Sequence, residues 1–195
     1  MFKRRKRGTK REPTAGAVGE VCECTRAPEA RYQTNSTTRT PGWYDSAAMS
    51  HSYANNHLHI VYSTKNRENL ISSKFEPRLY SFVAEVAREQ GIPLIAAGGM
   101  PNHSHLLILL PATKSLADAI NALKANSSRF MGQQGIEFEW QRGYGAFAVS
   151  ASHVDQVKAY IRNQKEHHKK RTFEEEFVAM LKKAGVDYDP KYVFG

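Results

Sequence analysis

The sequence predicts an α+β fold, in which an antiparallel sheet carries helices on one face in the ferredoxin-like, split βαβ arrangement. Short runs rich in β-branched and aromatic residues alternate with longer runs of helical period, in the order β-α-β-β-α-β followed by further helices. Only a few turn residues separate the second strand from the third, so these two should form a hairpin. A tyrosine-bearing helix should complete the fold near the C-terminus.

The spacing of apolar residues and the helix-capping residues set the bounds of each element. Predicted strands cover residues 57–63, 92–97, 103–110 and 147–150. Predicted helices cover residues 75–90, 115–131 and 173–184, with one more that begins at Ser152 and carries Tyr160. Pro77 lies in the first turn of the first helix, and Gly91 follows its end. Ser115 and Ser152 are predicted N-caps, because an aspartate follows each three residues later.

Charge favours a polyanionic partner, of which nucleic acid is the commonest. The 195 residues include 28 Lys or Arg against 19 Asp or Glu, a net charge of +9. Residues 1–48 carry +5 of this charge and residues 49–195 carry +4. The patterned part is therefore only mildly basic, and charge alone is a weak argument for DNA.

Residues 1–48 are basic, rich in Thr, Gly, Pro and Ser, and without hydrophobic period, which predicts a disordered leader before one domain at 49–195. Two interpretations stay open: the native protein starts at Met49, or the leader is an arm that adds nonspecific phosphate affinity. The only cysteines, Cys22 and Cys24, lie there without a second pair for a zinc site. A membrane-spanning helix needs about 20 consecutive apolar residues, and no apolar run in the sequence is close to that length. We therefore expect no association with a membrane and a cytoplasmic location.

The most specific pattern in the chain is a pair of histidines, His103 and His105, at the start of an apolar strand. Alternation along a strand places both on one face and Ser104 on the other. An unsatisfied imidazole would be costly among apolar neighbours. On the later helix, Tyr160 and Gln164 are four residues apart and project together. These four side chains predict a metal held by neutral ligands beside a tyrosine nucleophile.

Several other residues offer alternatives. His57 and His59 have the same spacing and are not excluded by sequence alone; we expect His59 to form a hydrogen bond or to face DNA. His167 and His168 are adjacent on a helix and diverge by about 100°, so we expect phosphate contact or solvation rather than shared metal binding. Tyr144, between two glycines, is the second candidate nucleophile.

A metal would make tyrosine chemistry feasible at neutral pH. A phenol has a pKa of about 10, so it is a poor nucleophile at neutral pH. A metal ion helps because it polarises the phosphate and stabilises the negative charge that develops there. Neutral ligands leave the charge of Mg²⁺ or Mn²⁺ undiminished, and imidazole ligands favour Mn²⁺. Attack would leave a 5′-phosphotyrosine and a free 3′-hydroxyl, so rejoining would need no ATP.

From about Ser52 to Leu181 the chain resembles the single-tyrosine HUH transposases of the insertion-sequence 200/605 group, which are related to the REP-associated tyrosine transposases. The resemblance rests on HIVYSTKNR at 59–67, MPNHSHLL at 100–107, WQRGY at 140–144, YIRNQ at 160–164 and EHH at 166–168. It implies that His103 and His105 are the metal-binding pair, Gln164 the third ligand and Tyr160 the nucleophile. Ser104 departs from the hydrophobic residue usual at this position, and we expect metal binding to survive this change.

The resemblance implies a metal-dependent single-stranded DNA endonuclease and strand-transferase that recognises hairpins near the ends of a mobile element. It also implies a homodimer whose tyrosine helix can complete the partner's site. The first alternative is a catalytically silent or domesticated hairpin-binding module on the same fold. The second is a hydrolytic nuclease that uses water instead of tyrosine. Predicted DNA-binding residues are Lys65, Arg67, Lys124, Arg129 and Arg142.

Overall fold

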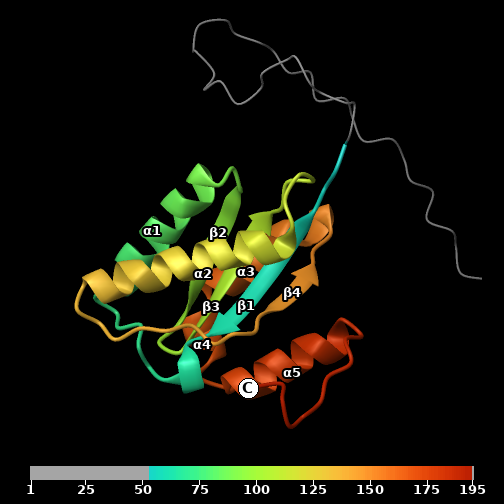
Figure 1. Ribbon diagram of the computed structural model, residues 1–195. Helices are drawn as coiled ribbons and strands as arrows, with labels where there is room; N and C mark the ends of the chain where they lie inside the picture. Colours follow the sequence, from blue (N-terminus) through green and yellow to red (C-terminus); the bar gives the residue numbers. More distant parts are fainter. Residues whose placement is uncertain (1–52, 195) are drawn as a thin grey trace, which may run out of the picture. The chain divides into compact units, whose positions relative to one another are not determined.

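The computed structural model describes residues 53–194, shown in Figure 1. Its strands are β1 (His57–Ser63), β2 (Leu94–Met100), β3 (His103–Leu109) and β4 (Gly145–Ala148). Its α-helices are α1 (Glu76–Glu89), α2 (Leu116–Gln133), α3 (Val154–Arg162), α4 (Gln164–His167) and α5 (Phe173–Lys183), with 3-10 turns η1 (Lys65–Arg67) and η2 (Ala151–His153). The predicted leader at 1–48, with Cys22 and Cys24, lies outside the described residues. Within residues 53–194, no helix is both long and apolar enough to cross a membrane.

The four strands form one antiparallel sheet in the order β2-β3-β1-β4. This order and the succession of elements confirm the predicted α+β, split βαβ fold. In Figure 1, α1 and α2 lie on the near side of the sheet and α3, which carries Tyr160, lies beyond it. Different helices therefore pack on the two faces of the sheet.

Side-chain alternation gives the two faces different chemistry. One face of β1 and β3 is apolar and packs against α1 and α2; it includes Ile60, Tyr62, Leu106 and Ile108. The helices meet it with buried residues at helical spacing, such as Leu79, Val83 and Val86 in α1 and Ile120, Leu123 and Met131 in α2. The opposite face carries buried histidines beside a smaller apolar cluster centred on Val61, Phe173, Phe177 and Leu181.

Helix α3 approaches β2 closely, and Gly98 makes this possible. A Cβ added at Gly98 would lie 3.0 Å from the carbonyl oxygen of Ile161 and 3.1 Å from its Cγ2. Real Cβ atoms rarely come so close to a neighbour, so a side chain at position 98 would push the helix outward. Because Gly98 has no side chain, α3 can lie close to β2, and this contact sets the position of Tyr160.

Of the predicted boundaries that differ from the structure, three have identifiable reasons. Strand β2 starts at Leu94 rather than residue 92, because the Ile92 amide donates to the carbonyl oxygen at the end of α1 and Pro93 has no N–H. Strand β4 starts two residues earlier than predicted, because Gly145 pairs with Val61 of β1. Ser152 is not an N-cap: it lies within η2, and α3 begins at Val154.

Candidate active site

Buried polar side chains gather on the sheet face opposite α1 and α2. His103 and His105 of β3 are fully buried, Gln164 of α4 is 1% exposed and Glu176 of α5 is 3% exposed. Burying polar groups costs free energy unless each is hydrogen-bonded or bound to a metal. This cluster is therefore the strongest candidate site among the described residues.

The two strand histidines are each held through Nδ1. Asn102 Oδ1 lies 2.7 Å from Nδ1 of His103, and His59 Nε2 lies 3.0 Å from Nδ1 of His105. Since Asn102 Oδ1 can only accept, Nδ1 of His103 donates, and the lone pair of the neutral ring lies on Nε2. Nε2 of His103 and Nε2 of His105 are both buried without a hydrogen-bond partner. Metal-binding histidines are typically held in this way, with one nitrogen anchored and the other facing the ion.

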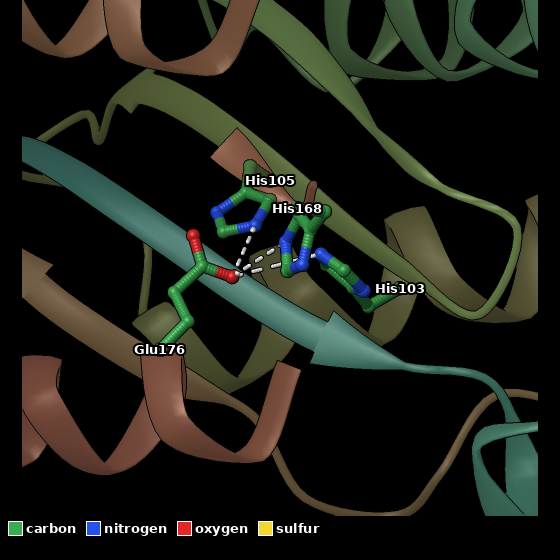
Figure 2. Close-up of side chains that lie close together, drawn as sticks. All are labelled: His103, His105, His168 and Glu176. Carbon is green, nitrogen blue, oxygen red and sulfur yellow. Dashed lines mark hydrogen bonds and ion pairs between the residues drawn. The ribbon is translucent and has the colours of Figure 1, made fainter. Parts of the chain in front are cut away.

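Glu176 reaches into the cluster from α5, as Figure 2 shows. Its Oε2 lies 3.5 Å from Nε2 of His105, 3.7 Å from Nε2 of His103 and 3.0 Å from Nε2 of His168. Its Oε1 accepts hydrogen bonds from Nε2 of Gln164, at 3.0 Å, and from the Tyr160 hydroxyl. One carboxylate thus connects the histidines to the tyrosine.

Burial and neighbouring groups set the protonation states. Burial, with His105 nearby, lowers the pKa of both His59 and His103 to about 3. Burial and the hydrogen bond to Glu176 raise the pKa of Tyr160 above its ordinary value. Burial acts to raise the pKa of Glu176, but the neighbouring His105 and the hydrogen bonds from Tyr160 and Gln164 outweigh it and hold this pKa well below normal. At neutral pH the site has neutral His59 and His103, an ionised Glu176 and a protonated Tyr160.

The structure brings together the four residues that the sequence pattern singled out. The ring of Tyr160 lies 5.9 Å from that of His105, centroid to centroid, and Gln164 shares Glu176 with Tyr160. Oε1 of Gln164 is buried without a hydrogen-bond partner. Ser104 faces the other side of the sheet, as expected, where its hydroxyl lies 3.0 Å from that of Tyr80. The catalytic and metal-binding roles themselves stay predictions.

Two of the remaining histidines also belong to the cluster. His59 forms the hydrogen bond that was one of its two expected roles, and it buries its ring against His105. The expected solvation of His168 was wrong, because its side chain is only 6% exposed and meets Glu176, whereas its expected phosphate contact stays a prediction. The His168 amide still donates to the Gln164 carbonyl oxygen, so His168 follows the helical path, and both rings reach Glu176 because its carboxylate presents one oxygen to each. Nε2 of His167 lies 3.8 Å from Oε1 of Glu176.

Sequence reasoning missed Glu176, although the sequence contains a signal. The buried face of α5 consists of Phe173, Glu176, Phe177 and Leu181, so a carboxylate stands in an otherwise apolar stripe. An acid at such a position is rarely buried without a partner. Thr172 and Glu175 form a capping box that fixes the start of α5 and therefore the direction of Glu176.

The donor set fits a metal ion. One ligand atom from each of His103, His105, His168 and Glu176 lies within 4.8 Å of the other three. The partnerless Nε2 atoms of the strand histidines and the partnerless Oε1 of Gln164 are lone-pair donors buried in the same cluster. Imidazole, carboxylate and carboxamide groups are all ordinary ligands of divalent ions.

A cavity of about 650 Å³ opens beside Tyr160 and Glu176. Arg171 and Lys183 contribute positive charge to its lining, and His59 and His167 contribute imidazoles. Tyr144, the second candidate nucleophile, lines a different cavity with Phe177 and is 39% exposed. Among the tyrosines of residues 53–194, Tyr160 is the one that reaches the histidine cluster.

The five predicted DNA-binding residues do not gather around Tyr160. Lys65 is exposed and pairs with Glu139 at 2.6 Å, and Arg67 pairs with Glu174 of α5 at 2.9 Å. Arg142 is exposed in the loop before β4. Their contacts with DNA stay predictions.

The two predicted contacts on α2 lie on the helix that covers the apolar face, away from the histidines. Nζ of Lys124 donates to the backbone carbonyls of Gln141, Arg142 and Gly143, and burial lowers its pKa to about 8. Arg129 is exposed and donates to Asn126 on the same helix. The ammonium of Lys124 therefore holds the loop that leads into β4.

Comparison with known proteins gives a family and several relatives. A family model described as "Transposase IS200 like" matches residues 52–164. The ISDra2 transposase TnpA of Deinococcus radiodurans is 25% identical over 114 residues, which are 54% of this chain and 81% of that protein. The transposase for insertion sequence element IS200 of Salmonella typhimurium is 23% identical over 133 residues, 64% of this chain and 87% of that protein.

A solved structure of a REP-associated tyrosine transposase bound to a REP hairpin is also similar. It matches with a TM-score of 0.48 and 17% identity, over 63% of this chain and 74% of that one.

Proposed function

Because the chain belongs to the IS200-like transposase family, we propose that it cleaves and rejoins single-stranded DNA at the ends of a mobile element through metal-dependent attack by Tyr160. One observation carries this proposal. The Tyr160 hydroxyl donates to one oxygen of Glu176, whose other oxygen faces Nε2 of His103 and His105. The nucleophile and the candidate metal ligands thus share a single carboxylate.

In this proposal His103, His105 and Gln164 hold a divalent cation, Mg²⁺ or Mn²⁺, which polarises the scissile phosphate when bound. Glu176 orients the phenol through Oε1. The Tyr160 oxygen attacks phosphorus and its proton passes to Glu176, while the bond from phosphorus to the 3′-oxygen breaks and that oxygen takes up a proton. The products are a 5′-phosphotyrosine and a 3′-hydroxyl, and the reverse reaction joins a new 3′-hydroxyl to the phosphate.

The cavity beside Tyr160 is consistent with a flexible, single-stranded substrate that reaches the tyrosine. Arg171 and Lys183 in its lining can neutralise phosphates next to the bond that is cut. Hairpin recognition and a homodimer are further parts of the proposal and rest on the family resemblance. In the structure Tyr160 meets the histidines of its own chain.

A denaturing-gel assay tests the proposal. Single-stranded hairpin DNA from the flanks of the gene is incubated with the full chain and Mn²⁺ or Mg²⁺, and a covalent protein–DNA band is sought. We expect the band with wild type, and no band with Tyr160→Phe, with His103→Ala or with a chelator. Tyr144→Phe, which changes an exposed tyrosine outside the cluster, is the matched control and should keep the band.

Each alternative gives its own result. Cleavage without an adduct that survives Tyr160→Phe would identify water as the nucleophile and contradict the proposal. Binding without cleavage on a verified end sequence would identify a silent hairpin-binding module.

A further inference from the structure

We propose that His168, directly after α4, and Glu176 of α5 bind the same cation as His103, His105 and Gln164, and that this donor set favours a transition metal. This inference rests on the metal-dependent function proposed above, and it adds two ligands that the sequence pattern did not assign.

The distances match ligands around one ion better than hydrogen bonds. Two ligand atoms each about 2.1 Å from an ion lie about 3.0 Å apart at a right angle and about 3.4 Å apart at a tetrahedral angle. Oε2 of Glu176 lies 3.0, 3.5 and 3.7 Å from the Nε2 atoms of His168, His105 and His103. The two longer separations exceed ordinary hydrogen-bond lengths.

Proton positions point the same way. Nδ1 of His168 lies 3.0 Å from the carbonyl oxygen of Arg171, which can only accept, so Nδ1 carries the proton of the neutral ring. Its Nε2 lone pair then faces Oε2 of Glu176, as do the Nε2 atoms of the two strand histidines. A second proton on His168 would satisfy that one pair and leave Nε2 of His103 and His105 without partners. A single cation would bind all four ligand atoms, namely the three Nε2 atoms and Oε2 of Glu176.

The donor types select the metal. Three imidazoles and one carboxylate suit Mn²⁺, Co²⁺ or Zn²⁺, whereas Mg²⁺ prefers oxygen ligands and keeps several waters. The carboxamide of Gln164 donates to Oε1 of Glu176 and so holds the carboxylate in place.

Isothermal titration of the metal-free full chain with Mn²⁺ and Co²⁺ tests the inference. We expect Glu176→Gln and His168→Gln each to weaken binding by about 100-fold or more. Loss of a residue that only hydrogen-bonds to a ligand lowers metal affinity by about 10- to 100-fold. Asn102→Ala removes the hydrogen-bond partner of His103 and therefore gives a reference for this smaller effect. Glu166→Gln and His153→Gln change exposed residues of the same types and serve as matched controls that bind like wild type.

X-ray absorption of the Co²⁺-loaded protein gives a second readout, with three imidazole ligands in wild type and two in His168→Gln. This count decides the question even if Glu176→Gln does not fold. Unchanged affinity in His168→Gln with two imidazoles in both proteins would overturn the inference, as would tighter binding by Glu176→Gln, because the carboxylate would then compete with the ion. Wild-type affinity in His103→Ala would instead contradict the metal site of the proposed function.

Discussion

Ser104 stands between the two strand histidines, yet it belongs to the other face of the sheet. Its side chain is fully buried and its hydroxyl lies 3.0 Å from the hydroxyl of Tyr80 on α1. Burial raises the pKa of Tyr80, so the phenol stays protonated, and the two hydroxyls satisfy each other. The polar residue at this position thus has a local partner and leaves the histidines undisturbed.

Ser104→Ala should therefore destabilise the protein by about 1–2 kcal/mol, because the Tyr80 hydroxyl loses its buried partner. Tyr80→Phe combined with Ser104→Ala should recover much of this loss, since no unpaired hydroxyl remains. Urea denaturation of the two single variants and the double variant measures the coupling. If the losses of the two single variants simply add in the double variant, the hydrogen bond between the two hydroxyls contributes nothing to stability.

Spacing predicted that His103 and His105 share one face of a strand, and β3 confirms this. The expectation that one helix carries both Tyr160 and Gln164 was wrong, because α3 ends at Arg162 and Gln164 begins α4, although Glu176 still contacts both side chains. Glu176 could not be placed in the same way, because it reaches the histidines only through the packing of α5 on the sheet. The burial of His168 could not be predicted for the same reason, because it results from contact with Glu176 of α5.

At the scale of elements, the position of Tyr160, the proposed nucleophile, depends on how closely α3 lies against β2. Gly98 allows this contact, and the carbonyl oxygen of Ile161, next to Tyr160, lies where a side chain of residue 98 would begin. A change on the strand should therefore be transmitted to the tyrosine through one backbone contact.

Gly98→Ala should cost about 1–3 kcal/mol of stability, because the added methyl group overlaps α3. It should also lower the rate of covalent adduct formation, since Tyr160 moves with its helix. Gly132→Ala is the matched control: nothing lies within 4 Å of its new methyl group, and alanine favours the α2 helix by about 0.5–1 kcal/mol. Thermal unfolding and the gel assay measure both effects, and a Gly98→Ala protein with wild-type stability and rate would contradict the prediction.

Elements with clear local signals were predicted well. Strand β1 has the predicted bounds, β3 begins at the predicted His103, and the Ser115 side chain caps α2 by accepting from the Asp118 amide. The break between α3 and α4 could not be predicted, because the segment from Tyr160 to His167 has no proline or glycine to mark it. Its position follows from tertiary contacts of α4 with the sheet and α5.

At the scale of the whole molecule, β1, β3 and α5 all contribute buried titratable groups to one cluster. The folded protein keeps His59 and His103 neutral, with pKa values of about 3, whereas in the unfolded chain they take up protons below about 6.5. Their contribution to stability is therefore present above pH 6.5 and is lost as the pH falls toward 3. Glu176 acts in the same direction, since its lowered pKa favours folding above its ordinary value of 4.5.

The metal-free protein should thus lose stability steadily between pH 6.5 and pH 4, by about 1.4 kcal/mol per pH unit for each proton taken up on unfolding. Denaturant unfolding in a chelator at several pH values measures this slope. His59→Gln removes one of the groups and should reduce the slope by about one proton. A wild-type free energy of unfolding that stays constant over this range would contradict the prediction.

The family match ends at residue 164, whereas His168 and Glu176 come after it. Tyr160 and the strand histidines belong to the matched stretch, whereas α5, with the Glu176 carboxylate that contacts them, does not. If Glu176 binds the metal as proposed, a mutation in α5 changes the metal affinity while every residue of the matched stretch stays the same.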